Sequence, residues 1–149
     1  MADDWLVRTV PAQPMVIKPA SIHLVSGHDQ AANSVVGSDP ACLWLAPRRA
    51  LVVAFDHAVT PDGEFVSDVT DGQTVFALAN PDDIIAMATT LDPALLAPGL
   101  CAQTLFAGVK ALLWRRGDMM LVHVDRPLGN YLAAWLAKAG SALQGHPSS

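Results

Sequence analysis

Charged residues are scarce in this sequence. Asp, Glu, Lys and Arg make up 15% of the 149 residues, against about 25% in ordinary soluble domains. Hydrophobic residues reach 52%, and a domain of this length leaves much of its surface exposed. A contiguous exposed apolar surface usually marks the place of a partner. The composition therefore favours a subunit that another chain covers, and the alternative is a monomer that scatters these side chains singly.

Positive charge is the scarcer sign, since 9 Lys and Arg face 14 Asp and Glu, for a formal net charge of −5. Nucleic-acid binding and attraction to an anionic membrane both need a basic face, so the balance argues against both. The most apolar long window, residues 91–114, is interrupted by prolines, a glutamine and a lysine, which argues against a membrane span. The start, MADDWLVRTV, places acids where a signal peptide needs basic residues. We expect a cytoplasmic protein.

Motifs for cofactors and catalysis are missing as well. The two cysteines form no CxxC pair, no GxGxxG or GxxxxGKS loop occurs, and the five histidines have no spacing typical of a metal site. We expect reduced thiols, no metal and no catalytic residue in this chain. His123 alternates within an apolar strand, which predicts a packed side chain with one hydrogen bond.

Proline, glycine and hydrophobic periodicity divide the chain into three parts. Residues 1–40 are the least periodic and predict an extended N-terminal arm with one strand; residues 41–142 predict a single domain; residues 143–149 predict a flexible tail. The domain begins with an apolar hairpin around PRR and continues with a strand over residues 74–78. The order of its elements predicts the α+β class, with an antiparallel sheet and two main helices packed on one face.

The two helices carry recognisable boundary signals. Asn80 and Pro81 open a helix that is predicted to run through DDIIAMATTL and to stop before the next proline. Three strands, CAQTLF, VKALLW and MMLVHV, follow it. The last helix begins at Asp125, presents one apolar face and closes at Gly140.

Four acids in DVTDGQTVFALANPDD are candidates for chemistry, but three have local roles. Asp71 precedes a glycine in a turn, and Asp82 with Asp83 lies in the first turn of the helix, where the helix dipole favours negative charge. Asp68 has no such role and stays the one candidate for chemistry, with a capping or turn role as the alternative.

Two arginine pairs at hairpin ends are candidate partner-binding residues. Arg115 and Arg116 follow ALLW, and Arg48 and Arg49 lie in the first hairpin. Guanidinium groups bind carboxylates in a bidentate manner, so each pair suits an acidic group of a partner. The alternative is a solvated hairpin tip.

Several motifs, in their order along the chain, resemble the gamma subunit of heterotetrameric sarcosine oxidase. They cover about two thirds of the chain: Asp-Val-Thr before a strand, Pro81 leading a helix that ends near Leu-Asp, Cys-Ala-Gln-Thr after a glycine, the Leu-Trp-Arg-Arg hairpin and Tyr-Leu-x-x-Trp-Leu in the last helix. Ala46 and Ala50 stand where that family usually has Gly and Trp, and residues 1–40 match it poorly. The equivalent subunit of a related methylamine-oxidising complex is therefore a second possibility.

The resemblance implies a fold like the folate-binding domain of the glycine-cleavage T-protein. It also implies a non-catalytic structural subunit of a flavin-dependent, folate-linked complex that demethylates a secondary amine such as sarcosine. The larger flavoprotein subunits would be its partners and would hold FAD, FMN, NAD and tetrahydrofolate, with none bound by this chain. The alternative is a free-standing tetrahydrofolate-binding protein of one-carbon transfer, similar to the T-protein, in which Asp68 would be the candidate residue to bind the folate.

Overall fold

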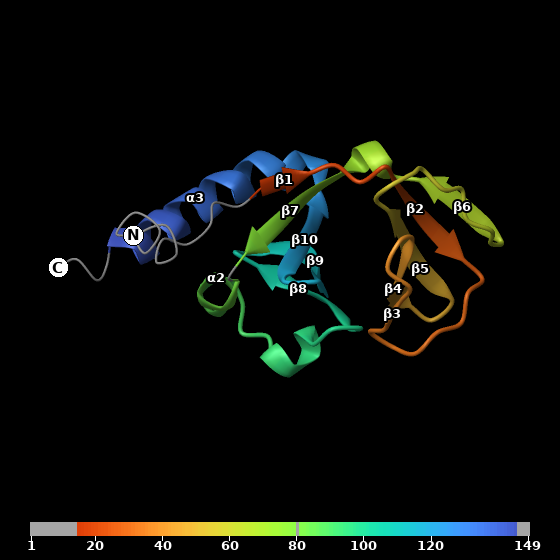
Figure 1. Ribbon diagram of the computed structural model, residues 1–149, viewed down its shortest axis with the longest axis horizontal. Helices are drawn as coiled ribbons and strands as arrows, with labels where there is room; N and C mark the ends of the chain where they lie inside the picture. Colours follow the sequence, from red (N-terminus) through yellow and green to blue (C-terminus); the bar gives the residue numbers. More distant parts are fainter. Residues whose placement is uncertain (1–14, 80, 146–149) are drawn as a thin grey trace, which may run out of the picture.

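Two antiparallel sheets and two α-helices make up the part of the chain that the computed structural model describes, residues 15–79 and 81–145 (Figure 1). The first sheet, sheet A, has the strand order β1-β7-β10-β9-β8. Its strands are β1 (Met15–Ile17), β7 (Gln73–Ala79), β8 (Cys101–Phe106), β9 (Val109–Arg116) and β10 (Met119–Asp125). The strands predicted from the sequence over residues 74–124 all lie in this sheet.

The second sheet, sheet B, has the strand order β3-β4-β5-β2-β6. Its strands are β2 (Ser21–Ser26), β3 (Val35–Val36), β4 (Ala41–Ala46), β5 (Arg49–Ala54) and β6 (Phe65–Asp68). The predicted hairpin around PRR is the β4–β5 pair. Short 3-10 helices at Thr70–Gly72, Pro93–Leu96 and Arg126–Leu128 connect the larger elements.

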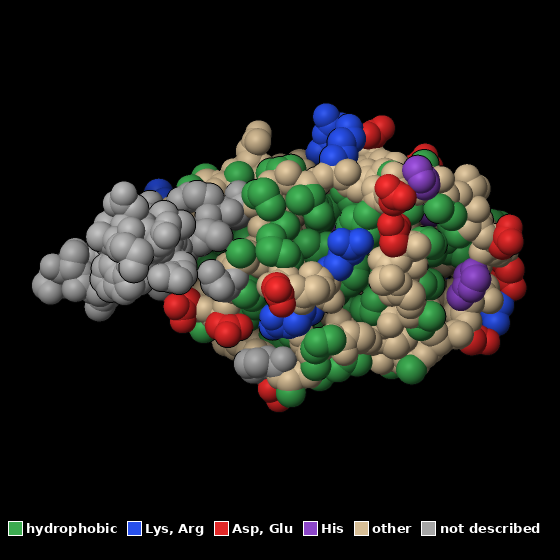
Figure 2. All heavy atoms as spheres, viewed as in Figure 1, with side chains coloured by type: hydrophobic (Ala, Val, Ile, Leu, Met, Phe, Trp, Pro, Cys, Tyr) green, Lys and Arg blue, Asp and Glu red, His purple; other side chains and the backbone are tan. Residues whose placement is uncertain are grey.

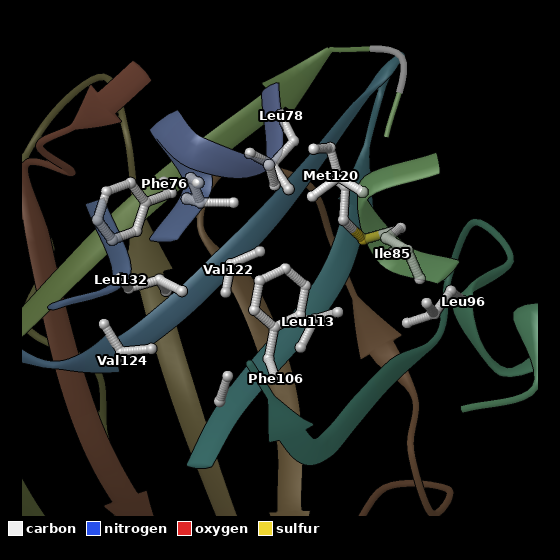
Figure 3. Packing of buried hydrophobic residues seen from close by; sticks show 14 of the residues in the cluster. Phe76, Leu78, Ile85, Leu96, Phe106, Leu113, Met120, Val122, Val124 and Leu132 are labelled. Atoms are coloured by element: carbon white, nitrogen blue, oxygen red, sulfur yellow. The ribbon is translucent and has the colours of Figure 1, made fainter. Parts of the chain in front are cut away.

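Both helices, α2 (Asp82–Ala88) and α3 (Gly129–Gly145), cover one face of sheet A. Alternate side chains of the sheet meet them in an apolar core, in which Phe76, Leu113, Val122 and Leu132 lie close together (Figure 3). Period-2 alternation in the strands and an apolar stripe on α3 bury these residues together. The predicted α+β arrangement, an antiparallel sheet with two helices on one face, is confirmed.

The helix boundaries differ from the prediction in two places. Helix α2 ends at Ala88 rather than Leu91, because Thr89 has extended backbone, with φ −150° and ψ 156°. Helix α3 continues through Gly140 to Gly145, since one glycine weakens a helix by only about 1 kcal/mol. The predicted cap at Asn80 lies outside the described residues.

A second apolar core lies between the two sheets. Ile22, Leu43 and Val53 of sheet B pack against Leu121 and Trp114 of sheet A. The molecule therefore has three layers, helices, sheet A and sheet B, of which the sequence predicted two. Each of these five side chains is at most 2% exposed, so this core is as dry as the one beneath the helices.

The predicted N-terminal arm contributes to both sheets where the structure describes it. Strand β1 pairs with β7, and β2 lies between β5 and β6 in sheet B. The sequence predicted one strand in this region because Lys18-Pro19 and the polar run SGHDQAANS hide its periodicity. Residues 1–14 lie outside the described residues.

Large hydrophobic side chains reach the surface on several elements (Figure 2). The most exposed are Met15, Val16, Val36, Phe65, Val66, Met87, Leu95, Leu105 and Tyr131. Edge strands β1, β3, β6 and β8 carry most of them, as the apolar composition predicted. Among the described residues, no helix has the length and apolarity needed to cross a membrane.

Candidate binding groove between the two sheets

A groove opens where the two sheets diverge. The sheets are joined near the start of β8, where the N–H of Val35 donates to the C=O of Gly99 and the N–H of Cys101 to that of Asn33, both at 2.8 Å. Toward the end of β8 they separate and leave an open cavity of about 690 Å³. Its apolar lining comes from both sheets and the loop before β7: Leu24, Leu45, Leu51, Val69, Leu105, Leu112. The volume falls in the range of about 300–1,000 Å³ that is usual for binding sites.

Strand register explains the chemistry of the sheet A wall. Alternate residues face sheet B, and the pairings arrange them in rows across β7, β10, β9 and β8. The innermost row, next to the second core, is Ala77, Leu121, Trp114 and Cys101. The next is Val75, His123, Leu112 and Gln103, and the outermost is Gln73, Asp125, Lys110 and Leu105. Polarity therefore increases from the dry core to the mouth of the groove, which we call the inter-sheet groove.

His123 is the buried polar side chain at the floor of the inter-sheet groove. It is 2% exposed, its Nε2 accepts a hydrogen bond from Nε1 of Trp114 at 2.9 Å, and its Nδ1 lies 3.0 Å from Oε1 of Gln73. Indole N–H is a donor only, so Nε2 carries no proton and Nδ1 donates to Gln73. Burial lowers the pKa of His123 to about 3. The imidazole is thus neutral in one fixed tautomer, with two hydrogen bonds where one was predicted.

Two carboxamides at the groove each have one atom without a hydrogen-bond partner. Oε1 of Gln73 accepts from His123, and Nε2 of Gln103 donates to the C=O of Leu45 at 2.7 Å. Among the described residues no protein atom pairs with the Nε2 of Gln73 or the Oε1 of Gln103. The groove therefore presents one free amide donor on β7 and one free amide acceptor on β8.

Lys110 and Asp125 are the charged side chains of the groove lining. Both are exposed, and neither belongs to an ion pair within the described part of the chain. Their charges have opposite sign and lie on neighbouring strands, each two residues beyond the His123–Leu112 pairing. With His123 neutral, the lining carries no net charge.

Asp68, the predicted folate-binding residue, lies at the end of β6 and outside the groove lining. Its Oδ1 accepts from the N–H of Thr70 at 3.0 Å and from the hydroxyl of Thr70 at 2.6 Å, and these bonds lower its pKa. The hydroxyl of Thr70 also bonds the backbone of Ile22. Asp68 thus holds the turn between β6 and β7, which is the turn role of the capping or turn alternative predicted from the sequence.

Arg115 and Arg116 point to opposite faces of sheet A, because they are neighbours in a strand. The Nε of Arg115 donates to the C=O of Leu96 at 3.2 Å and ties the segment after α2 to the sheet. The Cζ of Arg116 lies 3.9 Å from the ring centroid of Phe55, a cation–π geometry. The two guanidinium groups therefore cannot bind one carboxylate together.

Arg48 and Arg49 are likewise separated. Arg48 has a positive φ of 60° in the β4–β5 turn and forms ion pairs with Glu64 at 2.6 Å and Asp29 at 3.7 Å. Arg49 is the first residue of β5 and is exposed. Of the four arginines proposed from the sequence, Arg48 is thus already occupied by acids of the same chain. Partner binding by the others stays a prediction.

The cysteines are free thiols in shielded positions. Cys101 is 1% exposed, and burial raises its pKa to about 11; burial also raises the pKa of the half-buried Cys42. At neutral pH both are protonated and poorly nucleophilic. Among the described residues, no three His, Cys, Asp or Glu side chains gather in a way that could hold a metal ion.

Sequence reasoning missed the inter-sheet groove. Its signal was the polar residue two positions from an apolar one on the inward face of three strands: Gln103 with Leu105, Lys110 with Leu112, and His123 with Leu121. The alternation could be recognised, but its position relative to sheet B could not, because sheet B itself was not predicted.

Comparison with known proteins gives a fold for the whole chain. No family model matches the sequence, and no curated protein matches it significantly. A chain of the heterotetrameric sarcosine oxidase from Corynebacterium sp. U-96, solved in complex with pyrrole 2-carboxylate, is similar in structure with a TM-score of 0.80 and 17% identity. The similarity covers 99% of this chain and 95% of that chain. It confirms, at the level of the fold, the resemblance to heterotetrameric sarcosine oxidase that the sequence motifs indicated.

Proposed function

We propose that this protein is a non-catalytic structural subunit of a flavin-dependent, folate-linked oxidase or dehydrogenase complex that demethylates a secondary amine of the sarcosine type. The supporting observation is the correspondence, over 99% of this chain and 95% of the other, with a chain of a heterotetrameric oxidase. These two fractions mean that the matched chain is nearly as short as this one. A small chain of the same fold and size within a hetero-oligomer is a natural model for this protein's role.

The titratable side chains fit a structural role. A general base or nucleophile works best when its pKa is near the working pH. The pKa of His123 is lowered to about 3 and that of Cys101 is raised to about 11, so both shifts lead away from neutrality. In this proposal FAD, FMN, NAD and tetrahydrofolate belong to the larger, cytoplasmic partner subunits.

Co-expression tests the proposal. The chain is produced with the larger subunits of a sarcosine oxidase-type complex encoded beside it, and the mixture is separated by size exclusion with absorbance recorded at the flavin and protein bands. We expect all subunits to elute together as one complex. When this chain is omitted, the amine-dependent activity of the remaining subunits should decay faster over time. A chain that elutes alone as a monomer beside an intact, fully stable oxidase would refute the proposal.

A second function, tetrahydrofolate binding by the free chain in the manner of the T-protein, is favoured by one observation. The inter-sheet groove combines a volume of about 690 Å³ with a mostly apolar lining and two carboxamides, as small-molecule sites do. Calorimetric titration of the isolated chain with tetrahydrofolate separates the two functions. If the chain has only a structural role, we expect no heat of binding for tetrahydrofolate. Saturable binding at micromolar concentration would favour the second function.

A further inference from the structure

We infer that the inter-sheet groove is the docking site for an uncharged, apolar, extended segment of a larger partner subunit. This inference rests on the proposed function and names the surface through which the subunit would join its complex. Its basis is the exposure of the groove's rim, the charge of its lining and the positions of its unused hydrogen-bonding groups.

Large hydrophobic side chains are exposed in the groove and on the face of sheet B that continues its wall. Leu105, in the lining on β8, is 59% exposed. Phe65, on β6, lies outside the lining, is 77% exposed and pairs with Ser26, on the face of sheet B that carries Leu24 of the lining. Leaving apolar surface in water costs about 25 cal/mol per Å². An apolar occupant that covers both walls removes this cost.

The floor of the groove offers no charge to an occupant. Lys110 and Asp125 lie in the outermost row at the mouth, and inside them His123 is neutral with both ring nitrogens bonded. The other side chains of that inner row are the apolar Val75 and Leu112 and the uncharged Gln103. A charge brought past the mouth to this floor would find no counter-charge beside it and would lose its hydration, so the complementary occupant is uncharged where it crosses the floor.

The unused groups of the two glutamines match a peptide backbone. The free Nε2–H of Gln73 can donate to a carbonyl, and the free Oε1 of Gln103 can accept from an amide N–H. The two residues lie on β7 and β8, three strand spacings apart in sheet A, or about 14 Å. An extended segment of about four to five residues spans that distance and supplies both a carbonyl and an N–H.

The floor distinguishes a peptide from a small ligand. Compact ligands are oriented by a few polar groups deep in their pocket. The deepest polar group here is the imidazole of His123, whose Nδ1–H donates to Gln73 and whose Nε2 accepts from Trp114, so neither ring nitrogen is free. Free hydrogen-bonding groups remain at the sides only, which suits a chain that crosses the groove rather than a molecule that enters it end-on.

The test compares charge substitutions on two sides of the molecule within the full complex. Leu105→Glu places a charge in the groove lining, and Phe65→Glu places one on the face of sheet B that continues the groove wall; we call these two the rim variants. Met87→Glu is the matched control, because Met87 is 49% exposed and lies on α2, on the other side of sheet A. All three residues are exposed, so the variants should fold, and thermal unfolding of each isolated chain verifies it. Affinity for the larger subunits is measured by interferometry with the tagged chain immobilised.

We expect the two rim variants to bind the larger subunits at least tenfold more weakly than the original chain, and Met87→Glu to bind within twofold of it. Amide hydrogen exchange should slow at β6 and β8 when the complex forms. If the rim variants bind as tightly as the original chain, the groove is not the docking site, while the proposed function stands. If even the original chain fails to bind, the proposed function and this inference both fall. A self-associating chain whose dimer Leu105→Glu disrupts would place a second copy in the groove and overturn the inference.

Discussion

Trp114 donates its indole N–H to Nε2 of His123 across the β9–β10 pair, at a distance of 2.9 Å. The two residues sit one row apart on the inner face of sheet A, where the second core meets the floor of the groove. Since the indole can only donate, the bond holds the imidazole neutral and sends its Nδ1–H to Gln73. The core and the groove are thus linked through one hydrogen-bonded chain of three side chains.

This linkage predicts acid-sensitive stability. The pKa of His123 is about 3 in the folded protein against its ordinary value of 6.5, so the unfolded chain binds a proton first as the pH falls. The contribution is complete above about pH 6.5 and is lost progressively from there toward pH 3. We expect the free energy of unfolding to fall by about 1.4 kcal/mol from this residue between about pH 7.5 and pH 5.5. Urea unfolding at the two pH values measures it.

His123→Gln is the control for that measurement, because glutamine keeps an acceptor for the indole and does not titrate. The variant should lose this part of the pH dependence while retaining what the other groups contribute. An equal pH dependence in the two proteins would mean that His123 is protonated in the fold, contrary to the bond from Trp114. Nitrogen chemical shifts of the ring would give the tautomer independently.

Removing the donor is a second test of the same pair. Trp114→Phe keeps an aromatic ring in the core but leaves Nε2 of His123 without a partner and opens a void beside Phe55, whose ring centroid lies 5.9 Å from that of Trp114. An unpaired buried polar atom costs about 1–3 kcal/mol, and lost volume adds to it. We expect the free energy of unfolding to fall by roughly 2–4 kcal/mol in chemical denaturation. A loss below about 0.5 kcal/mol would contradict the structural role of this bond.

The sequence predicted sheet A and its helices well because their signals are local. The strand over residues 74–78, the β9–β10 hairpin and the apolar face of α3 each follow from period or turn residues within a short window. Sheet B depends on distant pairing, since β2 joins β5 and β6 across 23 or more positions, as in Ile22 with Val53 and His23 with Asp68. No short window of the sequence contains both residues of such a pair.

The candidate groove was harder to predict than the fold for the same reason. Gln73, Gln103 and His123 come from three strands, and their relation depends on register and on where sheet B stops covering sheet A. Asp68 illustrates the reverse case: a capping or turn role was predicted for it only as an alternative, although it bonds Thr70 just two positions away. The turn could have been foreseen from Asp-Val-Thr, in which a carboxylate commonly accepts from the backbone two residues on.

Thiol reactivity should distinguish the two cysteines. Cys101 is buried with a pKa near 11, whereas Cys42 is half-buried, although its pKa is also raised. Because the thiolate is the nucleophile, we expect iodoacetamide at about pH 8 to label Cys42 at least tenfold faster than Cys101 in the native protein. Peptide mass spectrometry after timed quenching measures both rates. Equal rates in urea provide the control, and rapid native labelling of Cys101 would show that the joint between the sheets opens.

Two glycines of α3 should respond to alanine in opposite directions. A Cβ on Gly140 meets no atom within 4 Å, so Gly140→Ala gains helix propensity and should stabilise the protein by about 0.5–1 kcal/mol. A Cβ on Gly129 would lie 2.7 Å from Oγ1 of Thr74 and 3.2 Å from its Cβ and Cγ2, where α3 begins above β7. Gly129→Ala should therefore destabilise it by roughly 1–3 kcal/mol.

Thr74→Ala is the rescue variant for this pair, because it removes both the hydroxyl and the methyl group that the new Cβ would crowd. In the Gly129→Ala background it should recover part of the lost free energy of unfolding, a coupling that a double-mutant cycle isolates. Purely additive effects would mean that Gly129 is needed for its backbone alone. Since its φ of −61° is helical and open to any residue, we expect coupling, which would show that α3 is held close to sheet A by the absence of one side chain.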